Sequence, residues 1–70
     1  MRGPKFTYRS YRRRVRSDGV WRWQTDWRWH LKGGNGEIIA SGEAYATRAG
    51  VRRGIRAVVR CAMHAGMEEA

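Results

Sequence analysis

The motif Trp-Arg-Trp occurs twice in the chain, at positions 21–23 and 27–29. In each copy the tryptophans share one parity and the arginine has the other, which is the period of two expected for a strand with one buried face. We interpret the polar triplet at 24–26 as a short turn, with Asp26 as a turn residue. The pattern therefore predicts two short strands, from Val20 to Trp23 and from Trp27 to Leu31.

A hairpin turn follows these strands. The stretch 32–36 ends in Asn-Gly, a pair suited to the positive backbone angles of a tight turn. Residues 37–41 contain two consecutive isoleucines and predict a third strand, and residues 42–46 are interpreted as a loop.

The remainder of the chain predicts one helix. Thr47 is a good N-cap and Gly66 is a natural C-terminal stop. Five apolar residues fall on one side of this helix: Val51, Ile55, Val58, Val59 and Ala62. That side should pack on the tryptophan face of the sheet, so that Trp21, Trp23, Trp27 and Trp29 form the core. The alternative for the tryptophans is stacking on unpaired bases.

The first nineteen residues leave two structures open. Phe6, Tyr8 and Tyr11 are strand formers, and Ser17-Asp18-Gly19 is itself a hairpin-turn signal. Residues 5–16 are therefore either an additional strand or a flexible arm.

The predicted fold class is α+β. It is a three-stranded antiparallel meander, or a four-stranded one if the start adds a strand, followed by one C-terminal helix packed on one sheet face. The division of the chain is 1–19 as a basic arm or extra strand, 20–66 as the β-β-β-α domain, and 67–70 as a tail.

The size of the chain points to a second copy. Seventy residues make one domain of marginal stability with exposed sheet edges, which favours a homodimer. Cys61 is the sole cysteine, so neither an internal disulfide nor a zinc cage supports the core, and a reducing, cytoplasmic setting is expected. No apolar run approaches the length of a membrane span.

Positive charge is concentrated at the start of the chain. The net charge is +9, and residues 1–19 carry seven Lys and Arg against one Asp. A second set of arginines forms a ridge on the predicted helix, with no acid between positions 44 and 67. Such surfaces attract polyanions, and the planar fork of arginine suits phosphate. The candidate nucleic-acid-binding residues are Arg12, Arg13, Arg14, Arg16, Arg48, Arg52, Arg53, Arg56 and Arg60.

Motifs for catalysis and metal binding are missing from the sequence. Cys61 and His64 have helical spacing, but two ligands do not close a zinc site. The carboxylates are not spaced to pair with each other or with a histidine as acid and base. We therefore expect no catalytic residues, no metal and no cofactor.

Four segments together resemble the YegP-like family of small bacterial and archaeal domains. They are Trp27-Arg28-Trp29-His30-Leu31-Lys32, Asn35-Gly36-Glu37-Ile38-Ile39-Ala40, Ser41-Gly42-Glu43-Ala44-Tyr45, and Thr47-Arg48-Ala49-Gly50 with Gly54-Ile55. The resemblance covers residues 20–60. It implies a three-stranded meander plus helix, with two such units that join into one sheet and exchange C-terminal strands.

The chain departs from the family pattern in three places: the basic start, the short turn at 24–26, and the few residues after Gly66 that are left for an exchanged strand. A second register places Asp18-Gly19-Val20-Trp21-Arg22-Trp23 as the family's first turn and second strand. Continuity into Asn35-Gly36-Glu37 favours the first register. The family has no characterised function, so no site residue is carried over.

Two functions follow from this composition. The first is a non-enzymatic protein that binds DNA or RNA with low specificity through its arginine-rich surfaces. The alternative is a protein–protein interaction module that docks on an acidic protein surface, as in small phage or regulatory proteins.

Overall fold

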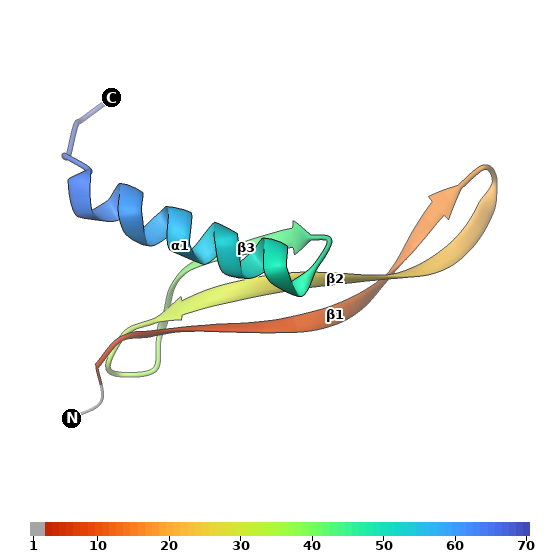
Figure 1. Ribbon diagram of the computed structural model, residues 1–70, viewed down its shortest axis with the longest axis horizontal. Helices are drawn as coiled ribbons and strands as arrows, with labels where there is room; N and C mark the ends of the chain where they lie inside the picture. Colours follow the sequence, from red (N-terminus) through yellow and green to blue (C-terminus); the bar gives the residue numbers. More distant parts are fainter. Residues whose placement is uncertain (1–2) are drawn as a thin grey trace.

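The central strand of the protein is β2, which runs from Val20 to Lys32. In the computed structural model, which describes residues 3–70, β2 pairs antiparallel with β1 (Lys5–Ser17) and with β3 (Ile38–Tyr45). The strand order β1-β2-β3 is a meander, and one helix, α1 (Arg48–His64), follows it in the chain. The predicted α+β meander with a C-terminal helix is confirmed (Figure 1).

Two predicted boundaries are wrong, and at the first of them the alternation of faces continues where we expected a break. The triplet 24–26 is not a turn. Thr25 lies on the tryptophan side of β2, Asp26 lies on the other side, and both Trp-Arg-Trp copies belong to one strand. The predicted loop at 42–46 is also wrong, since β3 continues to Tyr45. For residues 5–16, the strand is the correct alternative.

Both hairpin turns lie where the sequence predicted them. Asp18 and Gly19 have φ angles of 51° and 76° and connect Ser17 to its partner Val20, as a two-residue turn with left-handed central residues requires. The second turn precedes β3, and Gly36 in it has a φ angle of 84°. The first turn leads into an unbroken register between β1 and β2, whereas the pairing of β2 with β3 has two irregularities.

The core lies where α1 packs on the sheet. Val51 of α1 is fully buried, and Trp29 of β2 is 5 % exposed. The Trp29 ring meets Phe6 edge-on with centroids 5.5 Å apart, and its Nε1 donates a hydrogen bond of 3.2 Å to the Tyr45 hydroxyl. A Cβ at Gly42 would lie 2.3 Å from Trp29 Nε1, so only glycine admits the indole there. The core is small and is centred on one tryptophan.

The predicted N-cap of the helix is confirmed. The Thr47 hydroxyl accepts a hydrogen bond of 2.9 Å from the Gly50 amide. The helix ends at His64, just before Gly66. Val59 and Ala62, in its second half, are exposed, so the sheet covers only the first part of the predicted apolar side.

The outer half of the β1–β2 hairpin has no third strand. Pairing of β3 with β2 ends at Trp27, so residues 12–25 form a two-stranded ribbon that we call the arm. Figure 1 shows the arm projecting well past β3 and α1. The radius of gyration is accordingly 15.3 Å, whereas a compact domain of this length has about 11 Å.

Candidate nucleic-acid interface

The register of the arm sorts its side chains onto two faces. The two strands pair residue by residue from Lys5 to Ser17 without a bulge, so every second side chain lies on the same side. We call the side on which α1 packs the helix face. On the arm this face carries three arginines and two tryptophans, which we call the Arg–Trp face: Arg12, Arg14, Arg16, Trp21 and Trp23.

The guanidinium groups of the Arg–Trp face lie over the indole rings. Arg12 Cζ is 4.8 Å from the centroid of the Trp23 ring. Arg14 Cζ and Arg16 Cζ are 4.9 Å and 5.8 Å from the centroid of the Trp21 ring. At such distances the ring attracts the cation. The attraction to the ring does not use the N–H donors of the guanidinium, so donors remain for a ligand.

The two tryptophans of the arm are exposed, which corrects the prediction that all four tryptophans form the core. Trp21 is 54 % exposed and Trp23 is 61 % exposed. Trp29 is buried and Trp27 is half-buried. The prediction failed for the arm because β3 and α1 do not extend over it (Figure 1). Two exposed indoles between arginines are a surface suited to a flat, anionic ligand.

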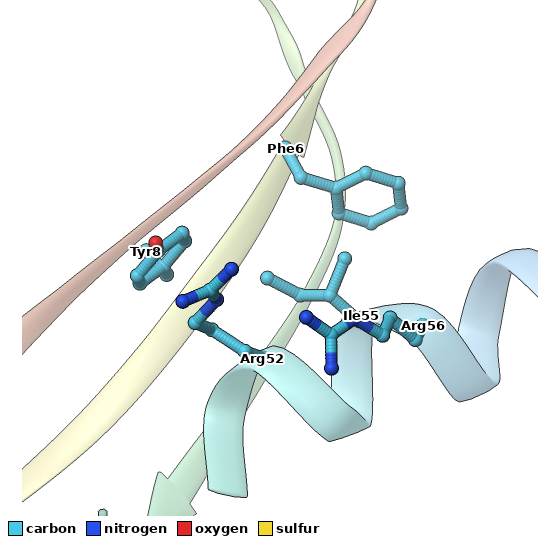
Figure 2. Close-up of a pocket in the computed structure, with 5 residues that line it drawn as sticks. All are labelled: Phe6, Tyr8, Arg52, Ile55 and Arg56. Atoms are coloured by element: carbon cyan, nitrogen blue, oxygen red, sulfur yellow. The ribbon is translucent and has the colours of Figure 1, made fainter. Parts of the chain in front are cut away.

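Three helical arginines lie on the same side of the sheet, beside the inner part of β1. Arg48 Cζ is 6.0 Å from the centroid of the Tyr8 ring. Two further arginines border a pocket of about 150 Å³ between β1 and α1, which is lined by Phe6, Tyr8, Arg52, Ile55 and Arg56. Figure 2 shows the Arg52 guanidinium directed from the helix toward Tyr8. Tyr8 shares its face of β1 with Arg12, so the pocket and the Arg–Trp face lie along one side of one strand.

The structure separates the other three predicted arginines from this surface. Arg13 lies on the opposite face of β1, where its Nε donates a hydrogen bond of 2.6 Å to Asp26 Oδ2. Arg53 and Arg60 are exposed on α1, and their helical spacing from buried Val51 places them away from the sheet. The sequence therefore identified the arginines but not their grouping.

Asp26 is a buried carboxylate at the base of the arm, not the turn residue that we predicted. It is 1 % exposed and accepts hydrogen bonds from Gln24 Nε2 at 2.8 Å and Arg13 Nε at 2.6 Å. The Gln24 hydrogen bond, with the hydrogen bond and charge of Arg13, lowers the pKa of Asp26 below its ordinary value, although burial opposes this. Sequence analysis missed this cluster, because Arg13 reaches Asp26 only through the pairing of β1 with β2.

The lowered pKa of Asp26 predicts a pH-dependent contribution to stability. A carboxylate with a depressed folded-state pKa stabilises the fold fully above its unfolded pKa of about 3.9 and loses this contribution as the pH falls through the folded-state value. In urea unfolding, Asp26→Asn should lower the midpoint at pH 7, and the difference from the wild type should narrow below about pH 4. If the difference between the urea midpoints of the two proteins stayed constant with pH, this role for Asp26 would be contradicted.

Other kinds of site find little support in the part of the chain that the structure describes. Across residues 3–70, no three His, Cys, Asp or Glu side chains gather as metal ligands. Cys61 is an exposed free thiol, and His64 is exposed in the last turn of α1. No helix within these residues has the length and apolar character to cross a membrane.

Comparison with known proteins covers the inner half of β2, β3 and α1, but neither β1 nor most of the arm. A family model described as "Domain of unknown function (DUF1508)" matches residues 24–69, which begin after the Arg–Trp face. The UPF0339 protein of Treponema denticola is 50 % identical over 42 residues, which are 60 % of this chain and 72 % of that protein. No solved structure matches the chain. Together with the YegP-like motifs in the sequence, these matches show that the chain belongs to the DUF1508 family.

Proposed function

We propose that the protein is a non-enzymatic, low-specificity nucleic-acid-binding protein whose binding surface is the Arg–Trp face. The observation that carries this proposal is the placement of three arginine guanidinium groups over two exposed indole rings along one side of a projecting arm. The charge of the arm supports it. Residues 12–25 contain one carboxylate, Asp18, and buried Asp26 follows directly after them. The same residues contain five arginines: Arg12, Arg13, Arg14, Arg16 and Arg22.

The spacing of the arginines suits a chain of phosphates. Arg12, Arg14 and Arg16 are two residues apart on one extended strand, so their backbone positions are about 6.7 Å apart. This distance is comparable with that between successive phosphates of a nucleic-acid strand. Attraction to the tryptophan rings restricts the arginine rotamers before binding, which reduces the side-chain entropy that binding a phosphate would otherwise cost.

Low sequence specificity follows from the groups that this face offers. Arginine edges contact phosphate oxygens, and indole rings contact the flat faces of bases. Neither contact distinguishes one sequence from another, because every nucleotide has a phosphate and every base has a π-face. The protein should therefore bind many sequences with similar affinity.

The proposal is tested by removing equal charge from two surfaces. One variant carries Arg12→Gln, Arg14→Gln and Arg16→Gln on the Arg–Trp face. Its matched control carries Arg9→Gln, Arg22→Gln and Arg53→Gln, which are exposed residues elsewhere. Binding to labelled DNA and RNA is measured against salt concentration. The first variant should bind more weakly, and its plot of log affinity against log salt should flatten by roughly 0.7 to 0.9 for each phosphate that the protein no longer neutralises.

The control variant should show a clearly smaller reduction in affinity and in slope. Equal reductions in both variants would mean that binding depends on net charge rather than on the Arg–Trp face. If the wild type binds neither DNA nor RNA at moderate salt, the proposed function is wrong. An acidic protein surface then becomes the partner to seek, recognised by a single stoichiometric complex.

A further inference from the structure

We infer that the ligand of the Arg–Trp face is single-stranded nucleic acid, which runs along the helix face from the tip of the arm to the pocket between β1 and α1. This inference rests on the proposed function and goes beyond it by naming the strandedness of the ligand and its path on the protein. The exposed rings, the continuity of the surface and the size of the pocket carry it.

The exposed rings favour unpaired bases. Trp21 and Trp23 present more than half of their surface to solvent, and Tyr8 is 36 % exposed on the same face of β1. In a duplex the face of each base is covered by its neighbours in the stack, so a protein ring has no base face to contact. In a single strand the bases turn outward and stack on aromatic side chains. The aromatic rings of this surface therefore contribute to binding only when the ligand is a single strand.

The surface is continuous and long enough for several nucleotides. Tyr8, Arg12, Arg14 and Arg16 lie on one face of β1, and the eight steps from Tyr8 to Arg16 span about 26 Å. Arginine–aromatic pairs recur along this line, from Arg48 over Tyr8 to Arg14 over Trp21. Alternating cations and rings provide both contacts that a single strand needs, to its phosphates and to its bases.

The pocket at the inner end has the size of one flat group. Its volume is about 150 Å³, whereas sites for complete small ligands span roughly 300 to 1,000 Å³. Phe6, Tyr8 and Ile55 provide apolar walls, and Arg52 and Arg56 provide positive charge (Figure 2). The pocket is therefore suited to one base of the strand, with an arginine beside its phosphate.

The experiment compares three probes of about 12 nucleotides each. The first is an oligothymidylate single strand. The second is a strand of abasic residues, with the same phosphates and no bases. The third is a mixed-sequence duplex. The protein is compared with the double variant Trp21→Leu and Trp23→Leu, which keeps apolar side chains but removes the stacking rings. Both tryptophans are exposed, so the variant should fold, as circular dichroism would verify.

The wild type should bind oligothymidylate at least about 10-fold more tightly than the abasic strand or the duplex. In the double variant the affinity for oligothymidylate should fall by about 5-fold to 150-fold for each base that no longer stacks. The affinities for the abasic strand and the duplex should fall by a clearly smaller factor, because these probes lose only the contact that restricts the arginines. If the duplex binds as tightly as the single strand and the tryptophan substitutions have no effect, the single-strand inference is wrong while the proposed function stands. If none of the three probes binds and a single-stranded RNA of the same length does not bind either, the proposed function itself fails.

Discussion

Trp29→Ala should unfold the protein. Trp29 is 5 % exposed, packs edge-on against Phe6, donates a hydrogen bond to Tyr45 and occupies the space that Gly42 leaves free. Truncating a buried aromatic side chain to alanine costs about 3 to 5 kcal/mol. The free energy of unfolding of proteins starts at about 5 kcal/mol, and small domains lie at this low end of the range. Urea and thermal unfolding, followed by circular dichroism, should show an unfolded or barely folded variant at 25 °C.

Trp23→Ala is the matched control for this prediction. It makes the same chemical change on the same face of the same strand, but Trp23 is 61 % exposed and lies on the arm. This substitution should lower stability by no more than about 1 kcal/mol, the range of an exposed cation–π interaction. The cooperative transition should remain. If the two variants were equally destabilised, the core would not be centred on Trp29.

A shortened arm should leave a folded protein that no longer binds nucleic acid. The variant lacks Arg14–Ser17 and Val20–Trp23, so the Asp18-Gly19 turn then connects Arg13 to Gln24. These two residues are partners in the sheet and lie on the same face as the original pair, Ser17 and Val20, so the turn fits the new ends. Four residues leave each strand, so all remaining side chains keep their faces. The Asp26 cluster and the core are retained.

The affinity for single-stranded DNA or RNA should fall at least about 100-fold, because the deletion removes two stacking rings and two of the three arginines that lie over them. Fluorescence anisotropy measures the affinity, and circular dichroism with thermal unfolding verifies the fold. Binding at the wild-type level would show that the arm is not the site. An unfolded variant would show that the arm supports the core, which its exposed side chains do not suggest.

Local features of the structure were predictable from the sequence. The Asp18-Gly19 and Asn35-Gly36 turns and the Thr47 cap depend on a few neighbouring residues, and all three are present. The boundary at 24–26 failed for an equally local reason. The triplet contains no glycine for the left-handed angles of a two-residue turn, and its polar residues fit the alternation of faces if Thr25 lies on the tryptophan side.

The candidate site was only partly predictable, because it depends on what covers each face. Alternation places Trp21 and Trp29 on the same side of β2, but only the ends of β3 and α1 decide that Trp29 is buried and Trp21 is not. The pairing of β1 with β2 likewise decides which arginines meet a tryptophan and that Arg13 meets Asp26 instead. Such interactions join residues far apart in the chain, and no local pattern specifies them.

The separation of the arm from the core has a consequence for how such a protein evolves. Most substitutions that change a buried residue reduce the folded fraction, and with it the amount of protein in the cell. The Arg–Trp face shares no residue with the packing around Trp29 and Val51 and lies outside the segment that relates this chain to its family. Mutation can therefore alter the ligand preference of the arm while the abundance of the protein stays the same.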